Sequence, residues 1–145
     1  MKKWVSGWKA DFPALEDAVS IRVRYAETDA MGWVYYANYY QYFEVGRTEL
    51  IRRAWKPYSE LERDGLWLPV VESGCRYYRG ARYDDLLLIR TRLTLPSAAR
   101  ARFDYRIERE CDDALLAEGF TVHCFLTSAS KPVAAPLELR NLVAK

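Results

Sequence analysis

The residues of this chain whose types and spacing could do chemistry lie in one turn, Glu27-Thr-Asp29-Ala-Met-Gly32, between a strand pattern and the longest helical pattern. A carboxylate at such a place can attack a carbonyl carbon or activate water for that attack. The free N–H groups of a first helical turn carry partial positive charge and can hold the oxyanion that forms. The same residues also fit an ordinary turn, in which Asp29 accepts a local N–H and Gly32 adopts a positive φ.

Two segments have to position this turn. Before it, residues 20–25 alternate between apolar side chains and polar or charged ones, which predicts a strand. After it, apolar and aromatic residues recur at helical spacing over residues 37–55, which predicts a long helix. Pro57 ends that helix because proline cannot continue it and disfavours helical backbone in the residue before it. Residues 58–65 are a polar connector that fits one more helical turn.

The rest of the chain is strand-like almost to its end, and short turns between the segments predict an antiparallel meander. Gly74 marks a bulge in the first of these strands, which is long or bent. The tail from Lys131 forms a loop and a short helix that starts near Pro136. The predicted strands cover residues 66–78, 85–95, 101–109 and 115–127; the apolar face of the last one holds Leu116, Phe120, Val122, Cys124 and Leu126.

The order of strand, long helix and four strands predicts an α+β domain. An apolar helix beside an antiparallel sheet with one polar face must be covered by that sheet, so about five strands are expected to wrap around one central helix. The expected boundaries are an N-terminal extension over residues 1–19, the folded domain over residues 20–130 and a C-terminal tail over residues 131–145. The extension is expected to fold back through Trp4 and Trp8.

Composition narrows the class of protein. The chain has 145 residues, of which 50% are hydrophobic and 14% aromatic, as in one globular domain. A formal charge of +2 does not indicate a nucleic-acid partner. No apolar run is long enough for a membrane span, and the N-terminus lacks the apolar stretch of a secretory signal. Three cysteines without a C-x-x-C pair favour a reducing cytoplasm.

Other reactive side chains have simpler explanations. His123 is the only histidine, so a structural or solvent-facing role is expected and no metal site is predicted. Cys75 and Cys124 alternate with apolar neighbours and are expected to be buried as small hydrophobic residues. Glu44 or Glu49 in the helix is the second candidate, after Asp29, for a catalytic carboxylate.

The segment from Tyr25 to Tyr39, followed by Phe43-Glu-Val-Gly-Arg-Thr-Glu49, resembles the hotdog-fold acyl-CoA thioesterases. It is most similar to the 4-hydroxybenzoyl-CoA thioesterase branch and the related Tol-Pal-associated enzymes. This resemblance implies a hotdog fold, with Asp29 as the catalytic carboxylate and the backbone N–H of Tyr36 as the donor that polarises the thioester carbonyl. Many Tol-Pal-type relatives have histidine where this chain has Tyr36. The backbone N–H at this position can still act as a donor, but this chain has no histidine side chain there to take part.

The resemblance also implies a substrate and an assembly. The expected activity is hydrolysis of an acyl-CoA or aroyl-CoA thioester without a metal or other cofactor, coenzyme A being part of the substrate. Open sheet edges favour a homodimer or homotetramer, with the site at the subunit interface. Arginine binds phosphate well, so some of the basic side chains near the strand loops could contact coenzyme A. The expected substrate-binding residues are Gly32, Trp33, Arg79 and Arg82.

The sequence leaves two other classes of protein open besides a thioesterase. One is an acyl-CoA-binding hotdog protein without catalysis, and the other is a structural or interaction protein. Within the enzymes, a dehydratase is disfavoured because it needs a catalytic histidine in or before the helix. Whether Asp29 attacks directly or activates water is not decided by the residue types.

Overall fold

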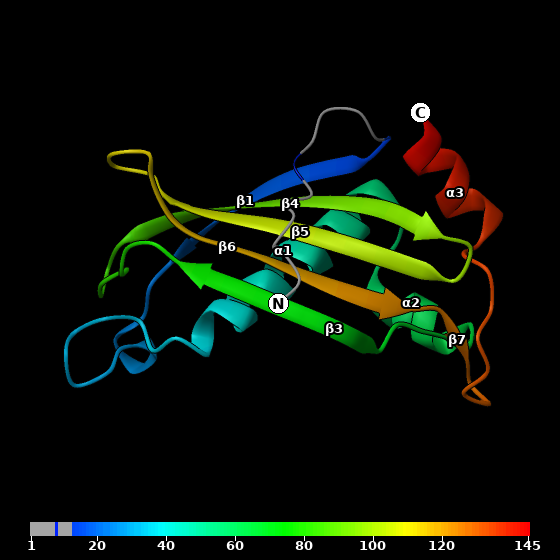
Figure 1. Cartoon of the computed structure of the whole chain (residues 1–145), viewed down its shortest axis with the longest axis horizontal. Helices are drawn as coiled ribbons and strands as arrows, with labels where there is room; N and C mark the ends of the chain where they lie inside the picture. Colours follow the sequence, from blue (N-terminus) through cyan, green and yellow to red (C-terminus); the bar gives the residue numbers. More distant parts are fainter. Residues whose placement is uncertain (1–7, 9–12) are drawn as a thin grey trace, which may run out of the picture.

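The protein is described by a computed structural model that covers residue 8 and residues 13–145. A long helix lies along one face of a curved sheet, and the two shorter α-helices lie toward the same end of that sheet (Figure 1). In chain order the elements are β1 (Leu15–Arg22), the 3-10 turn η1 (Tyr25–Glu27), α1 (Asn38–Ala54), α2 (Tyr58–Arg63), β2 (Leu66–Trp67), β3 (Val70–Tyr77), β4 (Leu86–Ser97), β5 (Arg100–Arg109), β6 (Ala114–Cys124), β7 (Leu126–Thr127) and α3 (Leu137–Ala144).

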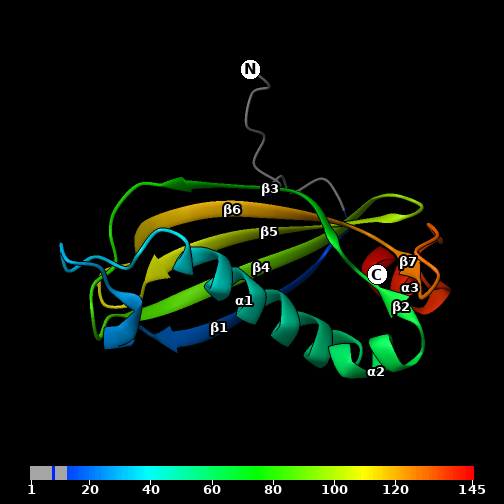
Figure 2. The ribbon, with the colours of Figure 1, turned by 90° about the horizontal axis from the view of Figure 1, so that it is seen from below.

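The main sheet has five strands in the order β1-β4-β5-β6-β3, and all of its pairs are antiparallel. Seen from below, the sheet curves over α1, which runs along its concave side (Figure 2). This arrangement confirms the predicted α+β class with five strands around one central helix. Within the described part of the chain no helix is both long and apolar enough to cross a membrane.

The predicted meander is only partly correct. Strands β4, β5 and β6 follow one another as neighbours, but β3 pairs with β6 and β1 pairs with β4. The chain therefore crosses the width of the sheet between β3 and β4, and β1 and β3 become its two edges. The small strands β2 and β7 pair with each other outside this sheet.

The first predicted boundary is wrong. Strand β1 begins at Leu15, not at Ser20, so the end of the expected extension over residues 1–19 belongs to the sheet. The strand also stops early, because Tyr25 opens the 3-10 turn and is 77% exposed. Trp8 lies beside the sheet, with the Arg106 guanidinium 5.5 Å from the centre of its ring, as expected for a segment that folds back. Trp4 lies outside the described residues.

The C-terminal tail contributes to the core. Leu139 and Val143 of α3 are buried at 3% and 5% exposure, so the segment over residues 131–145 packs on the domain. The predicted helix near Pro136 is confirmed, with Pro136 as the residue before its first turn.

The predicted strand over residues 66–78 is divided in two. Pro69 separates β2 from β3, since proline has no N–H to give to a strand pair. The register shifts between Val70 and Glu72, whereas Gly74 pairs in register with Phe120. The bulge predicted at Gly74 is therefore wrong, and the irregularity lies nearer the start of the strand.

Helix α1 presents a buried stripe at helical spacing, as its sequence pattern predicts. Gly46 lies in the middle of that stripe, where a Cβ atom would collide with Thr91 and lie 2.9 Å from Ile89 Cγ2. The absence of a side chain there lets the helix lie close against β4. The buried residues of α1 are Tyr39, Tyr42, Phe43, Gly46, Leu50 and Ile51.

The apolar face predicted for β6 is reversed from Gly119 onward, although Leu116 is buried in the core as predicted. Register places Gly119 opposite Tyr105 and Thr121 opposite Phe103, so these two residues face the helix. A Cβ atom at Gly119 would collide with the Phe43 ring, which explains why a small residue stands on the inner face. Phe120 instead lies on the outer face under the Arg102 guanidinium, 4.5 Å from its ring centre.

His123 has the structural role that was expected. Its Nδ1 lies 2.8 Å from the Leu68 carbonyl oxygen, which can only accept, so Nδ1 carries the proton. Nε2 then accepts a hydrogen bond from the Thr121 hydroxyl at 2.9 Å, and the Tyr105 hydroxyl donates to Thr121 at 2.6 Å. Burial is the main reason that the pKa of His123 falls from 6.5 to about 4.

This pKa predicts a loss of stability in acid. His123 is neutral in the folded protein, whereas an unfolded histidine with a pKa of about 6.5 binds a proton as the pH falls. The contribution of His123 to the free energy of unfolding is fully present above about pH 6.5. It falls by about 2–3 kcal/mol as the pH decreases toward 4. Urea unfolding at pH 7 and pH 4.5 should show His123→Gln losing less stability than the wild type between the two pH values. Equal losses would contradict the prediction.

Candidate active site

The turn that carries Asp29 is closed by its own backbone. The N–H of Asp29 donates to the Trp33 carbonyl at 2.7 Å, and the N–H of Gly32 donates to the Asp29 carbonyl at 3.0 Å. Gly32 has a φ of 81°, a conformation that favours glycine, as the sequence predicted. The position of the carboxylate therefore follows from a well-defined turn.

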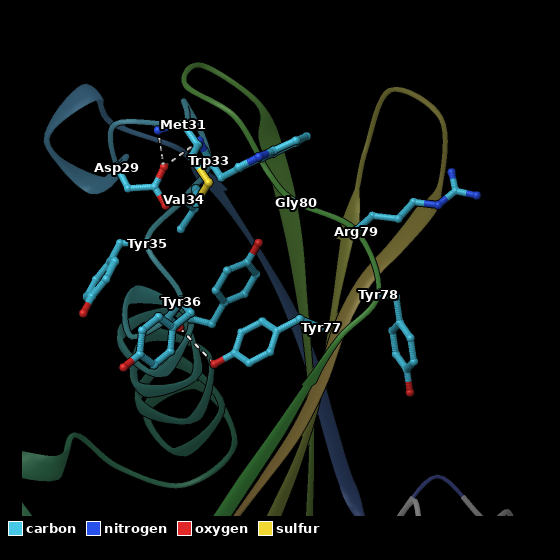
Figure 3. Close-up of a pocket in the computed structure, with 11 residues that line it drawn as sticks. Asp29, Met31, Trp33, Val34, Tyr35, Tyr36, Tyr77, Tyr78, Arg79 and Gly80 are labelled. Atoms are coloured by element: carbon cyan, nitrogen blue, oxygen red, sulfur yellow. Dashed lines mark hydrogen bonds between the residues drawn. The ribbon is translucent and has the colours of Figure 1, made fainter.

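The Asp29 carboxylate has one anchored oxygen and one free oxygen. Oδ1 accepts the N–H groups of Met31 at 2.9 Å and Trp33 at 3.2 Å. Oδ2 has no hydrogen-bond partner among the residues described, and Figure 3 shows the carboxylate on the groove side of the turn. The ordinary-turn interpretation and the catalytic one are thus compatible, since one oxygen serves the turn and the other remains available.

The same loop is fastened to its neighbours on both sides. Val34 donates its N–H to the Ala81 carbonyl at 2.8 Å, and Tyr35 donates its N–H to the Glu27 carbonyl at 2.9 Å. Isolated bridges also join Thr28 to Val34 and Trp33 to Arg82. The loop is therefore held between η1 and the connection from β3 to β4.

Helix α1 is preceded by two backbone N–H groups that remain open, whereas the N–H groups of Asn38, Tyr39 and Tyr40 donate to the carbonyls of residues 35–37. Its N-cap is Ala37, which has no side-chain oxygen, and its first turn holds no acidic residue. The Asn38 side chain instead donates to the Glu27 carbonyl at 2.9 Å. In the described part of the chain, the N–H groups of Tyr36 and Ala37 have no acceptor. These amides, at the positive end of the helix, are available to a developing negative charge.

Asp29 and the start of α1 meet at one groove, which has a volume of about 510 Å³. Figure 3 shows the carboxylate and Tyr36 on the same side of this groove, with Tyr77 reaching toward Tyr36 from β3. The predicted pair of catalytic groups thus lies beside a common space. The lining residues are Asp29, Met31, Trp33, Val34, Tyr35, Tyr36, Tyr39, Tyr77, Tyr78, Arg79 and Gly80.

Three of the four predicted substrate-binding residues form one cluster. The Arg82 guanidinium lies 3.8 Å from the centre of the Trp33 ring, and a Cβ atom at Gly32 would lie 3.4 Å from Arg82 Nη1. On its other side Trp33 packs against Gly80, where a Cβ atom would come within 2.8 Å of the indole Cδ2. Arg79 borders the groove, but its side chain points away from Asp29 (Figure 3).

The second candidates for a catalytic carboxylate lie elsewhere. Glu44 is exposed and does not line the groove. Glu49 forms ion pairs with Arg52 and Arg53 on the surface of α1. The geometry therefore favours Asp29 over both helical glutamates.

Glu27 is a site residue whose role the sequence did not reveal. It is only 7% exposed, and its Oε1 accepts the Arg24 N–H at 2.8 Å and the Tyr42 hydroxyl at 3.1 Å. Burial first, and then the charge of Glu27, raise the pKa of Tyr42 and keep its hydroxyl protonated. Together with the bonds to its carbonyl, these contacts tie η1, the Asp29 loop and α1 to one residue.

The cysteines take no part in this arrangement. Cys75 is half-buried and packs against the core, and burial raises the pKa of its thiol to about 11, which disfavours a thiolate nucleophile. Cys124 is also half-buried, so the expectation of full burial holds only in part for both. No three His, Cys, Asp or Glu side chains of the described residues are grouped so as to hold a metal ion.

Comparison with known proteins identifies the family. The model of the thioesterase-like superfamily matches residues 23–143. The acyl-CoA thioesterase YbgC of Haemophilus influenzae is 34% identical over 123 residues, which cover 83% of this chain and 88% of that protein. The chain therefore belongs to the thioesterase-like superfamily, as the motif around Asp29 suggested.

Solved structures support the same assignment. A protein from Thermus thermophilus is 37% identical with a TM-score of 0.81, and the match covers 88% of this chain and 96% of that one. The DHNA-CoA thioesterase of Staphylococcus aureus is 27% identical with a TM-score of 0.81, over 88% of this chain and 87% of that one. The predicted hotdog fold is confirmed.

Removing the Glu27 carboxylate tests whether it anchors the site. In Glu27→Ala the buried Tyr42 hydroxyl and the Arg24 N–H lose their acceptor, which should cost about 2–3 kcal/mol of folding free energy. Tyr42→Phe removes only one donor and should cost about 1 kcal/mol. Urea denaturation measures both changes. A Glu27→Ala variant as stable as the wild type would show that the carboxylate anchors nothing.

Proposed function

We propose that this thioesterase hydrolyses acyl-CoA or aroyl-CoA thioesters to the free acid and coenzyme A. Asp29 is the catalytic carboxylate, and the backbone N–H of Tyr36 is an oxyanion donor. The observation that carries the proposal is the groove itself, because it brings a carboxylate oxygen of Asp29 beside the N–H groups that precede α1, and none of these has a partner among the described residues.

The chemistry needs no further reactive group. A thioester carbonyl polarised by the Tyr36 N–H develops negative charge on its oxygen as a nucleophile adds to its carbon. In one route Asp29 takes a proton from water and hydroxide adds; in the other Asp29 adds directly, giving a mixed anhydride that water then cleaves. Both routes end with the acid and the coenzyme A thiol. The expectation that no cofactor is required stays a prediction.

The groove and its rim suggest how such a substrate lies. The walls are mostly aromatic and would accept either a flat aromatic acyl group or a short aliphatic one. Arg82 is exposed at the rim beside Trp33, where a guanidinium could contact a phosphate of coenzyme A. The side chain of Arg79 points away from Asp29, so a contact with substrate through Arg79 requires a more distant part of the molecule (Figure 3).

The exposed edge of the sheet supports the predicted homo-oligomer. Strand β3 is an edge strand, and Val70 and Val71 at its start are each 49% exposed. A second copy paired along β3 would cover these side chains and continue the sheet. Tyr77 at the end of the same strand lines the groove, so this pairing would place the site next to the partner.

Replacing the carboxylate tests the proposed reaction. Asp29→Asn keeps the turn-forming acceptor but removes the base or nucleophile, so thiol release should fall about 10²–10⁴-fold. Release of coenzyme A is measured over a panel of acyl- and aroyl-CoA thioesters. Binding of the same thioesters, measured by calorimetry, should change little.

Asp84→Asn is the matched control for this experiment. Asp84 is exposed in the next loop and has a φ of 68°, which asparagine also adopts readily. It should retain full activity. A wild type that binds these thioesters without hydrolysing them would instead identify a binding protein, and one that binds none would identify a structural or interaction protein. A hydrolase whose Asp29→Asn variant keeps its rate would contradict the role given to Asp29.

A charge on the sheet edge tests the assembly. Val71→Lys places a cation where a second β3 would pair, so self-association should weaken at least about tenfold. Sedimentation equilibrium measures the mass, which for the wild type should be a multiple of the 16.9 kDa chain. Leu137→Lys is the control, because Leu137 is 61% exposed but lies on α3, away from β3. A monomeric wild type, or equal effects of both changes, would contradict the pairing along β3.

A further inference from the structure

One hydrogen bond joins the edge strand directly to the start of α1. The Tyr77 hydroxyl, at the end of β3, donates to the backbone carbonyl of Tyr36 at 3.0 Å (Figure 3). We propose that Tyr77 is a positioning residue for hydrolysis, which orients and polarises the peptide that joins Tyr36 to Ala37. The inference rests on the proposed function, because it concerns the donors that hold the oxyanion.

The effect follows from the geometry of a peptide unit. The carbonyl of Tyr36 and the N–H of Ala37 belong to the same plane and point in opposite directions. Fixing the carbonyl oxygen therefore fixes the direction of the Ala37 N–H. A donor to the oxygen also draws electron density from the nitrogen, which strengthens the N–H as a donor by about 10–30%. Tyr77 thus acts through the backbone and does not need to touch the substrate.

The Tyr36 carbonyl has little else to hold it. Its other partner in the described structure is the N–H of Tyr39, and that bond is long at 3.4 Å. Tyr36 is 61% exposed, so burial in the core does not fix the residue either. The 3.0 Å bond from Tyr77 is therefore the shorter restraint on the last peptides before the helix.

The Tyr77 ring is itself held in place. It makes edge contacts with the rings of Tyr39 at 5.1 Å and Tyr36 at 6.4 Å between centres. The Tyr39 hydroxyl in turn accepts the Ala81 N–H at 3.2 Å, which fixes that ring in the wall of the groove. Burial, followed by the neighbouring Cys75, raises the pKa of Tyr77 above its usual range, so the hydroxyl keeps its proton for donation.

Tyr77→Phe tests the inference because it removes the hydroxyl and keeps the ring. We expect kcat for thioester hydrolysis to fall about tenfold, less than the ~10²–10³ expected from losing a whole oxyanion donor, while KM changes less than about twofold. The matched control is Tyr83→Phe. Tyr83 is 57% exposed in the connection from β3 to β4 and does not line the groove. It should leave both constants unchanged.

A spectroscopic readout separates positioning from a purely structural effect. Benzoyl-CoA labelled with ¹³C at its carbonyl is bound to Asp29→Asn and to Asp29→Asn with Tyr77→Phe, and the infrared carbonyl stretch is recorded. Strong oxyanion donors lower this frequency, so the double variant should show a smaller shift from the free thioester. Equal melting temperatures of the two variants would show that the fold is intact.

The outcomes distinguish the two proposals. If Asp29→Asn abolishes hydrolysis and Tyr77→Phe leaves kcat and the carbonyl frequency unchanged, the role of Tyr77 is refuted and the proposed function stands. If Asp29→Asn hydrolyses thioesters at the wild-type rate, the proposed function fails whatever Tyr77 does. A drop in kcat shared by Tyr83→Phe would also overturn the inference, because it would not be specific to the bond with Tyr36.

Discussion

The N–H groups of Tyr36 and Ala37, just before α1, are the feature on which the site depends, because they have no acceptor among the described residues. A serine or aspartate at the N-cap would stabilise a helix by about 1 kcal/mol by accepting an N–H group of its first turn. Here Ala37 stands at the N-cap, and the nearby Asn38 side chain donates to the Glu27 carbonyl. The first-turn N–H groups of α1 donate to the carbonyls of residues 35–37, which leaves the amides of Tyr36 and Ala37 for a ligand beside Asp29. Burial of Tyr42 and Phe43 one turn further along holds the helix in place without a cap.

The sheet decides where that helix end lies. Gly46 lies against Thr91 and Ile89 of β4, Gly119 lies against the Phe43 ring of α1, and Phe43 stacks on Tyr105 with 4.4 Å between ring centres. Protein interiors are packed as densely as crystals of small organic molecules. These contacts therefore require glycine, because a Cβ atom at either position would collide with a neighbouring side chain. Glu27 then ties the Asp29 loop to the same helix through Tyr42. The distance between the acid and the amides is thus a consequence of core packing.

Local patterns predicted the elements well, but contacts between distant segments were beyond them. The helix over residues 37–55 and the strand over residues 101–109 depend on periodicity within one segment, and both are confirmed. Strand β3 pairs with β6 because the chain crosses the sheet between β3 and β4, and no local sequence pattern indicates this crossover. The inner face of β6 was assigned by hydrophobicity, whereas the size of Gly119 and the polar chain through Thr121 decide it. Glu27 was missed as an anchor for a similar reason, since its partner Tyr42 lies on another element.

In the proposed reaction, the Asp29 carboxylate and the N–H groups of Tyr36 and Ala37 act on one carbonyl group. The crystal structure of Asp29→Asn with a bound acyl- or aroyl-CoA thioester tests this most directly. We expect the thioester oxygen within about 3.2 Å of the Tyr36 nitrogen, and the residue 29 side chain beside the carbonyl carbon or a water next to it. A thioester carbonyl bound elsewhere, with the N–H groups of Tyr36 and Ala37 facing only solvent, would contradict the account.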